Sequence, residues 1–199
     1  MNCHMPRLNE GMQDVVRTHM IYSPTRADMI EAGHPNACNL CHLDQPMGWS
    51  AQKLNEWYSI DKPALSTDQN EIAYAILKLT TGDAGQRALV AWSMGWEPAQ
   101  QASGAEWMAP YLGLLLNDSY EALRYMGGRS LQSLPGFAKF PYDFLGSPEA
   151  LSAVPNTVIT TWARARQGSK TPRRDLHVDV TTVRRLLSER DDTPVYLNE

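Results

Sequence analysis

The 199-residue chain lacks the features that mark membrane and nucleic-acid-binding proteins. Its longest uninterrupted apolar stretch is far shorter than the ~20 residues that a helix needs to cross a bilayer, and residues 112–116 are expected to be a core segment. No membrane span is therefore expected. The formal net charge is only -4, so no basic surface points to nucleic acid or to anionic membranes.

Motifs of the common enzyme classes are missing as well. The sequence has no Ser-His-Asp order, no glycine-rich phosphate loop and no carboxylate pair at a catalytic spacing, and adjacent Asp191 and Asp192 indicate the end of a helix. The chain does not open on a basic segment followed by an apolar one. Taken alone, that favours the cytoplasm, but the motif described below reverses this expectation.

Cysteine is scarce, with only Cys3, Cys38 and Cys41. An odd count argues against a closed disulfide framework. Histidine directly follows both Cys3 and Cys41. Thiols grouped with histidine signal a metal or a cofactor more often than a structural bridge.

The composition divides the chain into three regions, residues 1–62, 63–135 and 136–199. The first contains all three cysteines and four of the five histidines, together with many turn-forming prolines and glycines. It shows little apolar periodicity before a helix that we expect at 50–58. Such a stretch has few apolar side chains of its own to pack, so another group has to supply its core.

The second region predicts a run of short helices joined by tight loops. Each has one apolar stripe and begins at a capping residue or a turn, and the expected helices lie at 67–80, after Asp83, at 105–116 and at 120–134. Stacked helix pairs of this kind make an α-solenoid. The third region predicts an irregular connection, a helix near 156–166 and a last helix at 178–190 that packs on the repeats. The fold class is therefore mainly α, with no β-rich region.

Cys38, Cys41 and His42 have the C-x-x-C-H spacing that attaches haem c. Two thiols at this spacing reach the two vinyl groups on one edge of the porphyrin, and the next residue projects its imidazole beneath the ring. Histidine is a strong axial ligand for iron. Pro35 restricts the approach of the chain, and Asn36 is expected to cap the turn that carries the motif.

Two other kinds of site use the same residues. Zinc would take Cys3, Cys38 and Cys41 together with His4 or His42. A redox-active dithiol would use the C-x-x-C pair alone, although no βαβ pattern surrounds it.

Cys3 and His4 match the second half of another C-x-x-C-H motif, whose first cysteine would fall one place before Met1. This predicts a second haem c and a chain that begins inside a longer multihaem protein. Because haem c is attached outside the cytoplasm, the expected location is periplasmic or otherwise extracytoplasmic. The alternative is a free thiol near the terminus.

His19 lies away from any attachment motif and is a candidate distal ligand for one of the two haems, the alternative being a surface histidine. His34, four residues before Cys38, is a less favoured candidate. His177 lies between charged residues and is expected to be solvated.

Several segments together resemble the last two haem sites of multihaem cytochromes c that continue into HEAT-like helical repeats. They are residues 3–6, 18–25, 35–44 and 54–58, and residues 189–195 are similar to the end of such proteins. The resemblance covers nearly the whole chain; its haem motif is specific and its helical part is not. It implies that His4 and His42 are proximal ligands and His19 a distal one. Bis-histidine ligation implies a low-spin iron with no open position, and hence electron transfer.

Three functions remain open at this point. The first is an electron carrier that exchanges electrons with redox protein partners. The second is part of a catalytic multihaem oxidoreductase acting on small nitrogen or sulfur oxides, which needs an open iron position that the sequence does not reveal. The third is a helical-repeat module that binds a protein and carries a structural zinc or haem site. The sequence favours a carrier over a catalyst.

Overall fold

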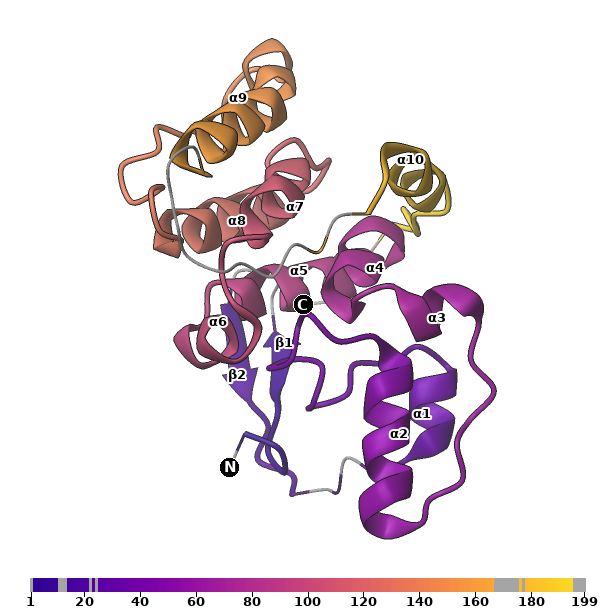
Figure 1. The fold of residues 1–199 in the computed structure, drawn as a ribbon. Helices are drawn as coiled ribbons and strands as arrows, with labels where there is room; N and C mark the ends of the chain where they lie inside the picture. The colour runs from indigo at the N-terminus through magenta and orange to yellow at the C-terminus, as the bar shows by residue number, and fades with distance from the viewer. Residues whose placement is uncertain are drawn as a thin grey trace.

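The computed structural model describes residues 2–10, 14–21, 23, 25–166, 176 and 178–194. These residues form ten α-helices and one antiparallel hairpin, which confirms the prediction of a mainly α protein (Figure 1). In chain order the elements are β1 (Arg7–Glu10), β2 (Asp14–Arg17), α1 (Ala27–Glu31), α2 (Met47–Tyr58), α3 (Thr67–Glu71), α4 (Tyr74–Thr81), α5 (Ala84–Met94), α6 (Glu97–Ser103), α7 (Met108–Leu115), α8 (Glu121–Ser133), α9 (Pro148–Arg166) and α10 (Val180–Ser188). No helix in the described ranges is both long enough and apolar enough to cross a membrane.

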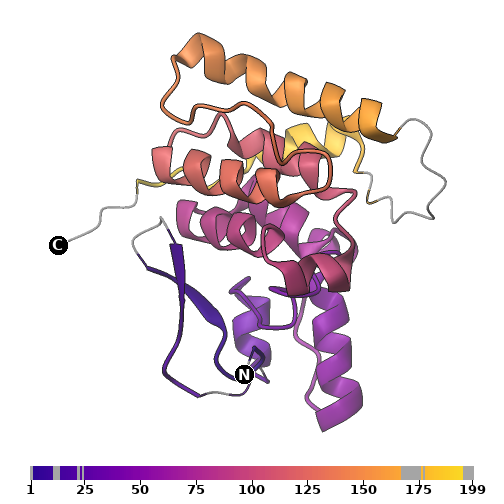
Figure 2. The ribbon, with the colours of Figure 1, turned by 90° about the vertical axis from the view of Figure 1, so that its left-hand side faces the viewer.

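Two stacked helix pairs form the centre of the molecule. α4 and α5 are joined by residues 82–83, and α7 and α8 by residues 116–120. α5 packs against α8 and α4 against α7, while α9 covers α7 and α10 packs on α4. Figure 2 shows these layers one above another, with α9 at the top and the N-terminal hairpin and α2 at the bottom.

A buried charge pair connects the two helix pairs. The fully buried Arg87 guanidinium of α5 lies 3.1 Å from the buried carboxylate of Asp118, which precedes α8. Asp118 also accepts a hydrogen bond from the Tyr120 backbone N–H at 3.1 Å. Both pairs have an aspartate in the connection, Asp83 or Asp118, and an arginine as the fourth residue of the second helix, Arg87 or Arg124. The arginines occupy equivalent places in the two pairs, whereas Asp83 directly precedes α5 and Asp118 lies three residues before the start of α8.

Local capping explains which helices the sequence located correctly. Asp83 accepts a hydrogen bond from the Gln86 N–H at 2.7 Å and begins α5 as predicted. The expected helix at 67–80 is instead two helices, because the backbone at Ile72 is extended. The first of them begins with Ser66, whose side chain forms a reciprocal capping box with Gln69.

Three elements depart from the sequence expectations. The hairpin was not expected, because each strand has four residues and Val15 is the one core residue that β2 contributes. No helix was expected at α6, but Pro98 lies in its first turn, where a missing N–H costs nothing. The helix α9 begins at Pro148, earlier than the expected 156, and continues through Pro155.

Candidate haem site

Residues 38–42 form one tight turn, which orients the side chains of Cys38, Cys41 and His42 toward the same cavity. The Cys38 carbonyl accepts hydrogen bonds from the Cys41 N–H at 3.2 Å and the His42 N–H at 2.7 Å. Residues three and four apart on such a turn are neighbours. The Asn36 side chain accepts a hydrogen bond from the Cys38 N–H at 2.9 Å, which confirms its predicted capping role.

The buried hydroxyl of Ser103 fixes this turn to α6. Its Oγ accepts a hydrogen bond from the Leu43 N–H at 2.8 Å and donates one to the Cys41 carbonyl at 2.9 Å. Ser103 is 1% exposed and Leu43 is fully buried, so the bond to the Leu43 N–H is shielded from water. A serine 62 residues further along the chain therefore sets the backbone between Cys41 and Leu43.

Other bonds hold the turn to α2 and α4. Buried Asn39 donates to the Gln45 carbonyl at 3.1 Å and accepts from the Ser50 hydroxyl at 2.6 Å. The Tyr74 N–H donates to the Gln45 carbonyl at 2.9 Å. These contacts pre-organise the motif from several elements, as a site that must hold precise geometry requires.

The motif side chains face a cavity of about 290 Å³, here called the Cys38 hollow. Its wall includes Cys3, Cys38, Cys41 and His42. The remaining wall includes four tryptophans and two arginines, which are Trp49, Trp57, Trp92, Trp96, Arg7 and Arg17, together with small and aliphatic residues. An aromatic wall with basic groups suits a flat apolar ligand that carries carboxylates.

Trp49 packs against the imidazole of His42. The two ring centroids lie 4.9 Å apart, with the planes tilted by 49°. His42 is half-buried and lines the hollow. The tryptophan therefore restricts the orientation of the proposed axial ligand.

The two arginines place positive charge in the wall. The Arg7 guanidinium lies 4.5 Å from the ring centroid of Trp92 and 5.7 Å from that of Trp96. Burial lowers the pKa of Arg7, nearby Arg17 lowers it further, and Asp14 acts in the opposite direction. An anionic group in the hollow would relieve this repulsion between the two cations.

Burial raises the pKa of both Cys38 and Cys41, and the proximity of Cys3 raises each further. The two motif thiols are therefore protonated near neutral pH, unlike the thiolates of reactive dithiols. All three cysteines are free of disulfides. Among the residues that the structure describes, no group of three or more His, Cys, Asp or Glu side chains is placed to hold a metal ion, so the zinc alternative gains no support.

The structure brings some of the other candidate residues to this site and leaves others apart. Cys3 lines the Cys38 hollow together with the motif, although the side chain is otherwise exposed. His4 and His19 are exposed, and neither lines the hollow. His34 lines a second hollow on the other side of the turn. His177 lies outside the described residues.

The aromatic and basic wall is the part of the site that sequence reasoning missed. Trp92 and Trp96 come from α5 and the residues after it, while Arg7 and Arg17 come from the hairpin. Trp92 and Trp96 are four residues apart, and this spacing was the one local sign that the two tryptophans share a face. Comparisons of the chain with known protein families, curated proteins and solved structures find no match. The functional argument therefore depends on the residues and geometry of the site.

Proposed function

We propose that this chain is an electron-transfer multihaem c-type cytochrome, with haem c bound covalently through Cys38 and Cys41 and ligated by His42. One observation carries the proposal. The three residues of the C-x-x-C-H motif lie on a single hydrogen-bonded turn, next to a hollow with four tryptophans and two arginines in its wall.

The residues of this turn fit the chemistry of attachment. Each thiol adds across one vinyl group, the sulfur bonding to one carbon and the hydrogen to the other, so the addition needs no oxidant or reductant. Because burial raises the pKa of Cys38 and Cys41, both keep the proton that this addition uses. Bound haem c supplies one-electron redox chemistry.

The remaining wall residues would hold the haem and orient its ligand. Trp49 packs against the His42 imidazole, which would ligate the iron. Arg7 and Arg17 offer charge-assisted hydrogen bonds to the propionate carboxylates that haem carries. The ring faces of Trp92 and Trp96 offer an apolar packing surface.

Cys3 and His4 are the proposed anchors of a second haem, with His19 as a distal ligand. The support is that Cys3 lines the same hollow as Cys38 and Cys41, so the two proposed attachment points lie near each other. Bis-histidine ligation leaves no open iron position, which favours an electron carrier over a catalyst.

The proposed arrangement has residues 1–62 as the haem-binding segment and residues 63–135 as HEAT-like repeats that brace it. Residues 136–199 would pack on those repeats. The recurring aspartate and arginine of the two helix pairs support the repeat assignment. The chain would act outside the cytoplasm, for example in the periplasm, and would exchange electrons with redox protein partners.

Carbon monoxide binding separates the proposed carrier from a catalytic cytochrome. The haem-loaded, reduced chain is expected to show no spectral change with carbon monoxide and to cycle reversibly on an electrode. A carbon monoxide complex would reveal an open iron and favour the catalytic reading. A chain that binds a protein partner tightly but is never reduced by it would favour the binding module.

A further inference from the structure

Two arginines of the N-terminal hairpin lie opposite each other across its strands. The register of the hairpin pairs Arg7 of β1 with Arg17 of β2. Residues directly opposite in an antiparallel pair have their side chains on the same face of the sheet, and like charges in such a pair destabilise it. The hairpin therefore holds an electrostatic cost that a neutral residue at either position would remove.

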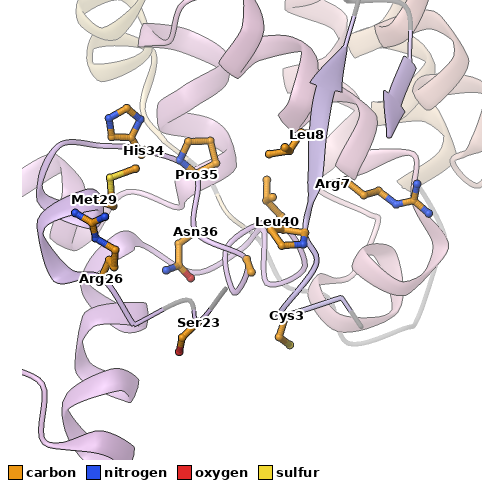
Figure 3. Close-up of a pocket in the computed structure, with 12 residues that line it drawn as sticks. Cys3, Arg7, Leu8, Ser23, Arg26, Met29, His34, Pro35, Asn36 and Leu40 are labelled. Atoms are coloured by element: carbon orange, nitrogen blue, oxygen red, sulfur yellow. The ribbon is translucent and has the colours of Figure 1, made fainter. Parts of the chain in front are cut away.

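This arginine pair belongs to the Cys38 hollow. Both arginines line it, together with the motif cysteines. Figure 3 shows the Arg7 guanidinium on the far side of β1 from Met29 and His34, which line the second hollow. The guanidinium lies 4.5 Å from the ring centroid of Trp92, which is part of the wall of the Cys38 hollow. The charge of Arg7 is thus directed to the side where the haem motif lies.

The hydrogen bonds of the pair leave a place for an anion. Arg17 donates to two neutral acceptors, the Met5 carbonyl and Asn2 Oδ1, each at 2.9 Å. The buried Nε of Arg7 has no hydrogen-bond partner among the described residues. Bonds from a guanidinium to a carboxylate are stronger than bonds to neutral acceptors. A carboxylate in the hollow would therefore interact with this pair more strongly than its present partners do.

The Asp14 carboxylate of the same hairpin is engaged elsewhere. Its Oδ1 accepts a hydrogen bond from the Trp92 Nε1–H at 2.9 Å, and its Oδ2 lies 4.0 Å from the Arg129 guanidinium. Burial lowers the pKa of Arg7, and Arg17 lowers it further against the opposing effect of Asp14. The two cations therefore still repel each other with Asp14 in place.

We infer that Arg7 and Arg17 determine which ligand the Cys38 hollow accepts, a porphyrin with free carboxylates, by binding its two propionates before the thiols attach. The inference deepens the proposed function and depends on it. Two propionates on one edge of a porphyrin match two guanidiniums on one face of a hairpin, and each planar guanidinium can bind a carboxylate through two parallel bonds. A flat apolar ligand without carboxylates would leave the two cations unrelieved.

Binding of two porphyrins that differ only in their carboxylates tests this selection. The probes are haemin and haemin dimethyl ester, whose propionates are uncharged, in the same buffer with dilute detergent. The chain carries Cys38→Ala and Cys41→Ala, so that neither probe attaches covalently, while His42 remains. Titrations followed by the Soret absorbance are expected to show haemin binding at least about 10-fold more tightly than the ester.

Variants assign this difference to the two arginines. Arg7→Met and Arg17→Met keep a long apolar stem, and each is expected to weaken haemin binding by about 10-fold and to leave binding of the ester unchanged. Arg7→Lys keeps the charge without the planar fork and is expected to restore part of the loss. Arg129→Met is the matched control, because Arg129 approaches Asp14 of the same hairpin but does not line the Cys38 hollow.

Circular dichroism before each titration checks that the variants are folded. Equal affinities for haemin and its ester, arginine variants that weaken both probes alike, or a chain that binds neither probe would overturn the inference. The proposed function is tested separately by the exported chain with both motif cysteines intact. Covalent haem there leaves the proposed function standing whatever the titrations show, and its absence refutes that function.

Discussion

Removing the Ser103 hydroxyl is expected to loosen the turn at residues 38–42 from the helical core. Ser103→Ala deletes the group that accepts from the Leu43 N–H at 2.8 Å and donates to the Cys41 carbonyl at 2.9 Å. The Leu43 N–H and the Cys41 carbonyl would then lose this partner at a place where Ser103 is 1% exposed. An unsatisfied buried polar group costs about 1–3 kcal/mol, so we expect the free energy of unfolding to fall by about 2–4 kcal/mol.

Ser93→Ala is the matched control for this prediction. Ser93 is also buried, but its hydroxyl donates only to the Leu89 carbonyl one turn earlier in the same helix. That carbonyl lies inside α5 and keeps its place in the helical hydrogen-bond ladder, so the loss is expected to be about 1 kcal/mol or less. Urea unfolding followed by far-ultraviolet circular dichroism measures both variants. Equal losses in the two would refute the conclusion that Ser103 anchors the turn.

Three more outcomes test other parts of the account. Asp118→Ala removes the buried carboxylate that lies 3.1 Å from Arg87 and leaves this arginine with the more distant Asp192 at 3.6 Å, so the free energy of unfolding in urea is expected to fall by about 3 kcal/mol. Arg185→Ala at an exposed pair is expected to cost under about 1 kcal/mol. Tyr74→Phe removes a fully buried hydroxyl that has no hydrogen-bond partner in the described part of the chain, so the thermal midpoint should stay unchanged or rise; a clear drop would mean that the hydroxyl is bonded. Burial raises the pKa of both Cys38 and Cys41. In the haem-free chain, iodoacetamide should therefore alkylate these thiols rapidly only at a higher pH than it alkylates a free thiol. Mass spectrometry measures the extent of alkylation. For the same reason the unfolded thiols lose protons first as the pH rises, so folding stability falls in the alkaline range.

Features set by neighbours in the sequence could be predicted from the sequence. The C-x-x-C-H motif, the Asn36 cap and the start of α5 at Asp83 each depend on residues within one turn of the chain. The central helices, including α8, were found for the same reason, since each buries one stripe of regularly spaced apolar residues. For the stacking of these helices the sequence predicted only a class of architecture, the α-solenoid, and not which helices contact each other.

Features set by distant contacts could not be predicted. The hairpin exists because it packs on α5, and four-residue strands have too short a pattern to reveal themselves. Ser103 had no sign in its own neighbourhood that it would hold Cys41. Arg7 reached Trp92 through the tertiary fold, so the basic and aromatic wall emerged only with the structure.

The most direct test of the central claim is the intact mass of the exported chain, recorded together with its pyridine haemochrome spectrum. The account predicts at least one covalently added haem, with the α-band typical of two thioether bonds, and its loss from a Cys38→Ala, Cys41→Ala protein. A folded, exported chain of unmodified mass that holds one zinc ion instead would contradict it.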